Sequence, residues 1–245
     1  MKGMILAAGI GSRLRPITDK IPKALLPVHG RPLLDYGICY LRKFGIRNII
    51  INIHHHADQI VAFIEKQNYR DLHLEFSDES DKLLDTGGAI KKASWFFEGE
   101  DDFLIVASDI ITNANLNELI HFHHQKKADV TLAVKNRETS RSLLFNDQGY
   151  LTGWKNNQTG ESKFIGWDKT YALDAGFSGI HVISTNVLDH MPDGAFSVTE
   201  FYLKAGSDLS IKAYRHDKDT WLEFGRISRI RQTEQSEIIK KIVDW

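Results

Sequence analysis

Two glycines and two basic residues near the start of the chain form the group whose spacing most suggests chemistry. Gly9 and Gly11 follow an apolar run that ends at Ala8, and Arg13 and Lys23 come shortly after them. Glycines at the end of a buried strand allow backbone N–H groups to approach a phosphate closely. Because Arg13 and Lys23 supply positive charge, the segment predicts a phosphate-binding loop.

The loop departs from two common phosphate-binding patterns. A Walker loop needs four residues between its glycines and then Lys and Ser or Thr, and the dinucleotide fingerprint needs a third small residue where Arg13 and Leu14 stand. A Gly-x-Gly pair alone could equally be a tight turn. The longer string is more specific: Ala7-Ala8-Gly9-x-Gly11-x-Arg13-Leu14-x-Pro16-x-Thr18, then Pro22-Lys23-x-Leu25-x-Pro27-Val28. It resembles the signature of the sugar-phosphate nucleotidyltransferases.

This resemblance implies a loop that wraps the triphosphate of a nucleotide. The residues that match the family's loop are Ala7, Ala8, Gly9, Gly11, Arg13 and Lys23. In the family the Arg and the Lys lie on the phosphates, so Arg13 and Lys23 are expected to act in catalysis as well as in nucleotide binding.

Two carboxylates are candidates for holding a metal. Asp109 closely follows an apolar strand, and ligands of open parallel sheets lie at the carboxyl ends of the strands. The alternative is that the Asp109 side chain caps a helix or a turn. By the resemblance, Asp109 is catalytic and holds Mg²⁺ against the triphosphate. Glu223 stands where the family has a second Asp. Because Glu reaches one methylene further, we expect either a shifted backbone or weaker metal binding.

The segment Asp85-Thr86-Gly87-Gly88 matches the family segment that places backbone against the nucleobase. Thr86 is expected to cap a helix, and the glycines after it are expected to leave free N–H groups and room for a flat ring. Glu79, upstream in a polar loop, could accept two hydrogen bonds from guanine or could simply be solvated.

Four residues are candidates for binding the sugar or its phosphate. Lys155 stands near the family's Glu-Lys-Pro and is expected to meet the sugar phosphate as a catalytic residue, although a solvated turn is an equal alternative. Trp154 replaces the Glu of that motif and could stack under a sugar ring. Gly179 matches a strand glycine against which the sugar lies, and Glu200 stands where several members bring an acid. The basic turn 137–141 could bind a phosphate or a carboxylate-bearing substituent, or be exposed.

The elements that must position these residues alternate between strand and helix. Apolar runs predict strands at 4–8, 46–53, 72–76, 103–107 and 130–134, and amphipathic segments predict helices at 32–44, 57–67, 86–97 and 116–126. This order predicts a Rossmann-like, three-layer α/β sandwich with a mixed, mainly parallel central sheet. Short strands from about residue 137 indicate a small antiparallel insertion, and one closing helix is expected over 227–243.

Composition narrows the functional class. The chain has 245 residues, 42% of them hydrophobic, and a formal net charge of −1. The near-zero charge argues against nucleic acid as a partner, and the single Cys39 favours a reduced, cytoplasmic setting. Apolar runs fall short of the ~20 residues of a membrane span, so no membrane association is expected. We expect one domain, with a nucleotide-binding half of about 1–136 and a sugar-binding half of about 137–245.

The resemblance is to short, single-domain members of the family, such as N-acetylmuramate-1-phosphate uridylyltransferase and heptose- or mannose-1-phosphate guanylyltransferases. It implies that an NTP and a sugar 1-phosphate react, with Mg²⁺, to give an NDP-sugar and pyrophosphate. Two alternatives stay open. One is a choline-phosphate cytidylyltransferase with an aromatic cage from Trp154, Trp167 and Tyr171. The other is a catalytically weakened nucleotide-binding relative, in which Glu223 and Arg226 reflect lost activity.

Overall fold

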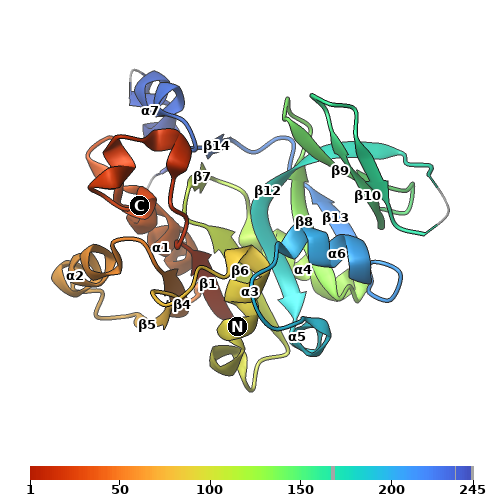
Figure 1. The fold of residues 1–245 in the computed structure, drawn as a ribbon, viewed down its shortest axis with the longest axis horizontal. Coiled ribbons are helices and arrows are strands. Elements are labelled where there is room, and N and C mark those ends of the chain that lie inside the picture. Colours follow the sequence, from red (N-terminus) through yellow and green to blue (C-terminus); the bar gives the residue numbers. More distant parts are fainter. Residues whose placement is uncertain (167–168, 235, 244–245) are drawn as a thin grey trace.

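The computed structural model describes residues 1–166, 169–234 and 236–243. A twisted central sheet runs through the molecule in the order β11-β10-β9-β12-β6-β1-β4-β5, with β8 and β13 attached beside β12 (Figure 1). Its central strands are β1 (Lys2–Leu6), β4 (Asn48–Ile53), β5 (His73–Asp78), β6 (Asp102–Ala107), β8 (Val130–Lys135), β12 (Leu173–Ser184) and β13 (Ile211–Arg215). Strands β6, β1, β4 and β5 are parallel, whereas β12 runs antiparallel to β6 and β8.

Helices cover both faces of this sheet. They are α1 (Leu33–Lys43), α2 (Ala57–Gln67), α3 (Asp85–Lys92), α4 (Leu116–Lys126), α5 (Val187–His190) and α6 (Val198–Ala205). Successive residues of a strand point to opposite faces, so Met4 of β1 joins the core formed with α3, α5 and α6, and Ile5 joins the core formed with α1, α2 and α4. The three-layer, mainly parallel sandwich expected from the sequence is therefore confirmed.

The antiparallel insertion extends the central sheet at one edge. It consists of β9 (Arg141–Phe145), β10 (Leu151–Asn156) and β11 (Ser162–Phe164), and β9 pairs with the first residues of β12. We call these three strands the flap. It stands at the opposite end of the sheet from β5, beside α6 (Figure 1).

Two small sheets and a third core hold the N-terminal loop. Strands β7 (Ile110–Thr112) and β14 (Trp221–Glu223) form one sheet, and β2 (Pro27–Val28) and β3 (Arg31–Pro32) form the other. Single 3₁₀ turns lie at η1 (Ser12–Leu14), η2 (Ile17–Asp19), η3 (Lys23–Leu25) and η4 (Ser94–Phe97). Leu14 and Phe224 are both fully buried in this third core.

The end of the chain differs from the expectation of one closing helix. The structure has α7 (Ile227–Glu234) and α8 (Ile238–Ile242), and Ile239 and Ile242 of α8 pack on the third core. Ile227 and Ile230 of α7 are partly buried against the same core, so two short helices carry the apolar residues of this segment. Within the residues that the structure describes, no helix has both the length and the apolar character that crossing a membrane requires.

Candidate active site

A cleft of about 1010 Å³ opens at the carboxyl ends of the central strands. One wall comes from the N-terminal half and includes Leu6, Arg13, Asp85, Thr86, Ala107 and Asp109. The facing wall comes from the flap, β12 and α6, and includes Trp154, Gly179 and Glu200. Glu223, from β14, also lines the cleft. The structure thus brings predicted residues from both halves of the chain to one cavity.

The N-terminal loop is shaped by one left-handed glycine. Gly11 has φ of 68°, which favours glycine. Its carbonyl oxygen accepts hydrogen bonds from the Leu14 N–H (2.8 Å) and the Thr18 hydroxyl (2.9 Å). These bonds close η1, and the loop then carries Arg13 into the cleft. Ala7, Ala8, Gly9 and Gly11 themselves are not among the cleft-lining residues that the structure describes.

Each basic residue of the loop pairs with one of the two predicted metal-binding carboxylates. The Lys23 ammonium contacts a carboxylate oxygen of Asp109, and both side chains are largely buried. The Arg13 guanidinium lies 3.8 Å from Glu223 Oε1 in a more exposed pair. A side chain at Gly225 would collide with that pair, because a Cβ there would lie 2.1 Å from Glu223 Oε1. Arg13, Asp109 and Glu223 line the cleft, and Lys23, which is not among the described lining residues, lies next to it through its contact with Asp109.

Asp109 and Glu223 come together because β7 and β14 pair. The Phe224 N–H donates to the Asp109 carbonyl at 2.8 Å, and Glu223 lies opposite Ile110 in the register. Within the described part of the chain no group of three or more His, Cys, Asp or Glu gathers as a metal site. Two carboxylates in a cleft nevertheless suit Mg²⁺, which usually keeps several water molecules and is bound through one or two carboxylates together with the phosphates of a substrate.

Arg137 was considered only as part of the basic turn 137–141, and the structure places it in the lining of the cleft. Its guanidinium stacks on the Trp221 ring, with 4.2 Å to the centroid, and Nη2 donates to the Phe177 carbonyl at 2.9 Å. Its Nε is buried and has no partner. Burial lowers the pKa of Arg137, while the charge of Glu223 opposes that shift. The cleft thus contains a guanidinium with an unused donor, for which the only sequence signal was the basic turn.

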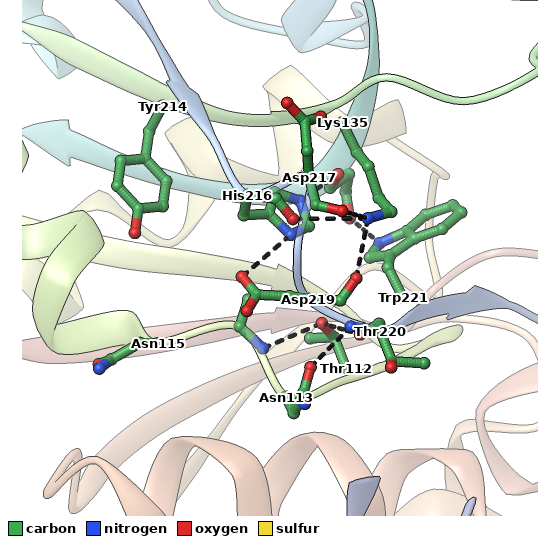
Figure 2. A network of polar contacts seen from close by, with 12 residues as sticks. Thr112, Asn113, Asn115, Lys135, Tyr214, His216, Asp217, Asp219, Thr220 and Trp221 are labelled. Atoms are coloured by element: carbon green, nitrogen blue, oxygen red, sulfur yellow. Dashed lines mark hydrogen bonds and ion pairs between the residues drawn. The ribbon is translucent and has the colours of Figure 1, made fainter. Parts of the chain in front are cut away.

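A polar network behind the cleft fixes the segment that leads into β14 (Figure 2). The Lys135 ammonium donates to three carbonyl oxygens of the turn 216–219, at 2.5 to 3.5 Å. The Thr220 N–H then donates to Asn113 Oδ1 at 2.8 Å, and the Thr112 hydroxyl to the Thr220 carbonyl at 2.7 Å. These contacts tie β14 to β7, and so determine where Glu223 lies relative to Asp109.

The same network supports Gly179, the β12 glycine that lines the cleft. β12 has an irregular register between Phe177 and His181, and Gly179 within it has φ of 73°. Trp221 Nε1 donates to the Ser178 carbonyl at 2.9 Å, and the buried His216 ring contacts the Ser178 hydroxyl at 2.7 Å. Burial, with the nearby charge of Lys135, lowers the pKa of His216 to about 4. His216 is therefore neutral at pH 7 and holds the bulge at Gly179 as a hydrogen-bonding group.

Glu79 has a different role from the one considered for it. It is fully buried, whereas a base-binding group must be accessible. Its Oε1 accepts from Asn52 Nδ2 at 2.7 Å and its Oε2 from the Leu84 N–H at 2.9 Å. Asn52 Oδ1 in turn accepts from the Ala7 N–H at 2.7 Å. Glu79 and Asn52 thus hold the first loop and the segment before α3 together, and a polar Asn within the apolar β4 was the available sequence signal.

The glycine pair in α3 also has a different explanation. The N–H groups of Gly87 and Gly88 both point to the Phe196 carbonyl, at 2.8 and 3.3 Å. A Cβ on Gly87 would lie 2.2 Å from the Phe196 ring, and one on Gly88 would lie 2.1 Å from the Gly194 carbonyl oxygen. The expectation of free N–H groups and space for a base at these two positions was wrong, because the loop before α6 fills that space. Asp85 and Thr86 line the cleft. The expectation that Thr86 caps the helix was wrong, because α3 begins at Asp85 and the Thr86 hydroxyl accepts from the Val198 N–H at 3.0 Å.

The structure does not bring Lys155 into the cleft, where it was expected to meet the sugar phosphate. Trp154 and Asn156 line the cleft, and Lys155 does not. Alternate residues of a strand point to opposite faces, and the Lys155 ammonium lies 4.0 Å from Asp174. Two of the three aromatic residues considered for a choline cage are not placed in the cleft. Tyr171 is 43% exposed and absent from the cleft lining, and Trp167 lies outside the described residues. The choline alternative therefore finds no support in the described residues.

Comparison with known proteins identifies the family. The family model described as Nucleotidyl transferase matches residues 2–145. The chain belongs to the nucleotidyl transferase family. A UTP–glucose-1-phosphate uridylyltransferase of Synechocystis is 28% identical over 99% of this chain and 64% of its own length. An N-acetylmuramate α-1-phosphate uridylyltransferase of Caulobacter vibrioides is 28% identical over 84% of each chain.

A third relative agrees with this assignment, and one solved structure shares the fold. The D-glycero-α-D-manno-heptose 1-phosphate guanylyltransferase of Aneurinibacillus thermoaerophilus is 31% identical over 61% of this chain and 69% of its own length. The fold is shared with HddC from Yersinia pseudotuberculosis, with a TM-score of 0.76 and 22% identity over 96% of this chain and 98% of that one. This nucleotidyl transferase chain spans about two thirds of the Synechocystis relative's length.

Proposed function

We propose that this protein transfers a nucleotidyl group from an NTP to a sugar 1-phosphate and releases pyrophosphate. The observation that carries the proposal is the arrangement of Lys23 with Asp109 and of Arg13 with Glu223 at one end of the cleft. Its relatives are named as uridylyl- and guanylyltransferases of sugar 1-phosphates. We infer that residues of about 1–136 bind the nucleotide and those of about 137–245 bind the sugar.

The charges assign roles to the chain's own residues. Lys23 and Arg13 would leave their carboxylates and bind the triphosphate, which carries more negative charge than either partner. Asp109 and Glu223 would hold Mg²⁺, which when bound neutralises charge on the phosphates. Ala7, Ala8, Gly9 and Gly11 would lie along the triphosphate, and the cleft-lining Asp85 and Thr86 would lie beside the nucleoside.

The nucleophile needs no general base, because the sugar phosphate oxygen that attacks the α-phosphorus is already an anion. Catalysis would then consist of positioning and charge neutralisation. We assign the incoming phosphate to Arg137, whose buried Nε is unpartnered, rather than to Lys155. Trp154, Gly179 and Glu200 would contact the sugar.

A screen for pyrophosphate release tests the proposal. Each of the four NTPs is combined with a panel of sugar 1-phosphates and with phosphocholine. Release with at least one sugar 1-phosphate, dependent on Mg²⁺, is the expected result. Release with phosphocholine alone would replace the proposal by the cytidylyltransferase alternative, and no release from any pair would favour a nucleotide-binding protein without transferase activity.

A further inference from the structure

One face of the flap points into the cleft and carries two positive charges. The register pairs Arg141 with Asn156 and Leu143 with Trp154 across β9 and β10, and Trp154 with Lys163 across β10 and β11. Directly paired residues of neighbouring strands project from the same face of a sheet. All five of these residues line the cleft, so an indole has an ammonium directly opposite it and a guanidinium diagonal to it.

The positive charges of Arg141 and Lys163 are not neutralised by other described residues of the protein. Within the described residues, no ion pair joins Arg141 or Lys163 to a carboxylate, and the Lys163 ammonium lies over the Trp154 ring, 5.5 Å from its centroid. The other basic residues of the cleft are engaged, Arg13 with Glu223 and Arg137 with Trp221. Unpaired cations that face a cavity are available to a ligand.

The proposed reaction leaves two cations of the cleft without a role. We assigned Arg13 and Lys23 to the triphosphate and Arg137, with its unpartnered Nε, to the reacting phosphate. Arg141 and Lys163 lie on the flap, with the hydroxyl-bearing Thr139 and Ser140 beside them in the lining. The acid on the facing side is Glu200 of α6, which suits sugar hydroxyls.

We propose that Arg141 and Lys163 form a subsite for a second anionic group on the sugar. The preferred substrate is then an acidic sugar 1-phosphate, which carries a carboxylate or a further phosphate besides the reacting one. The Trp154 ring offers the sugar an apolar surface between the two charges. This inference rests on the proposed nucleotidyl transfer and specifies the class of sugar that enters the same cleft.

Matched pairs of substrates test the subsite. N-acetylmuramate 1-phosphate is compared with its neutral carboxamide, and glucose 1,6-bisphosphate with glucose 1-phosphate, each with the NTP that the screen identifies. We expect kcat/KM to be ~10–100-fold higher for the acidic member of one pair, as charge-assisted hydrogen bonds imply. Preference in the first pair identifies a carboxylate subsite, and preference in the second identifies a phosphate subsite.

Variants then connect the preference to these residues. In Arg141→Gln/Lys163→Gln, the loss of kcat/KM on the acidic substrate should exceed the loss on its neutral partner by about tenfold or more. Lys204→Gln, an exposed lysine of α6 outside the cleft lining, is the control and should keep the wild-type preference.

Two outcomes overturn the inference and are distinguishable. Equal kcat/KM within both pairs, or equal losses on both members in the double variant, would reject the anionic subsite while leaving nucleotidyl transfer intact. Failure of every NTP and sugar 1-phosphate pair to release pyrophosphate would reject the proposed function, and the subsite with it.

Discussion

Asn52 is a buried link between the phosphate loop and the segment before α3, and its removal should be costly. Asn52→Ala leaves the Ala7 N–H without its acceptor and removes one donor from the fully buried Glu79. An unpaired buried N–H costs about 1–3 kcal/mol, and a lost hydrogen bond to a charged group about 1.5–3 kcal/mol. We therefore expect the free energy of unfolding to fall by about 3–5 kcal/mol, a large part of the total for a typical domain.

Urea unfolding at 25 °C, followed by circular dichroism, measures this loss. Asn48→Ala is the matched control, because Asn48 begins the same strand but is exposed; its change should stay within about 0.5 kcal/mol. A double-mutant cycle with Glu79→Ala should show a coupling of about 1–3 kcal/mol between the two buried residues. The KM for the NTP should also rise, because Ala7 begins the loop.

The reasoning would be refuted by an Asn52→Ala protein that is as stable as Asn48→Ala. A coupling near zero would show that Asn52 and Glu79 act independently, contrary to their 2.7 Å hydrogen bond. Wild-type-like KM values combined with a large loss of stability would separate the structural role of Asn52 from any role in positioning the loop.

Three further predictions concern other parts of the molecule. Lys135→Met removes the donor to the turn 216–219 and should lower the free energy of unfolding by about 1–3 kcal/mol. It should also lower kcat and the apparent affinity for Mg²⁺, as measured by metal titration of pyrophosphate release. Arg137→Met should lower kcat/KM for the sugar phosphate ~10–100-fold, whereas Lys155→Met should change it little. Asp102→Asn should lower stability at pH 7 by on the order of 2 kcal/mol, with urea unfolding at a series of pH values as the measurement.

The pH dependence of the Asp102 effect has a definite sign. Burial raises the pKa of Asp102, but hydrogen bonds from His123, Ser184 and His124 outweigh burial and lower it to about 2. A carboxyl with a lowered folded-state pKa stabilises the fold above its unfolded value of 3.8, and loses this contribution as the pH falls toward 2. The difference between wild type and Asp102→Asn should be constant above about pH 5 and shrink below pH 4.

Each of these predictions has a matched control and a contradictory result. Lys66→Met, on the exposed face of α2, should leave Mg²⁺ affinity unchanged, and an equal effect at both lysines would remove the role of Lys135. Asp101→Asn, at an exposed neighbouring position, should show no such pH dependence. If Lys155→Met proved as harmful as Arg137→Met, the flap would have to rotate its other face toward the substrate.

The sequence predicted those parts of the fold that arise from local periodicity. The apolar runs and the amphipathic segments appear as strands and helices in the predicted order, because each must bury one or two faces against its neighbours. The closing segment was predicted less well. Its apolar spacing suits one helix, but packing on the third core requires α7 and α8.

The site residues were harder to predict where their role depends on a distant partner. Gly87 and Gly88 are needed because the loop at 194–196 packs against them, and no local pattern reveals that contact. The face that Lys155 takes depends on the strand register, and a shift by one residue exchanges the two faces of a strand. The position of Asp109 was easier to predict, because a charged residue just after a buried strand must lie at the carboxyl end of the sheet.

The central claim is that the cations and carboxylates at one end of the cleft carry out nucleotidyl transfer. Its most direct test is pyrophosphate release by Asp109→Asn, compared with wild type under saturating NTP, sugar 1-phosphate and Mg²⁺, with folding of the variant verified by circular dichroism. We predict that turnover falls by at least ~100-fold, because the substitution removes the negative charge both from the proposed Mg²⁺ ligand and from the ion pair with Lys23. A folded Asp109→Asn protein with wild-type turnover would contradict the account.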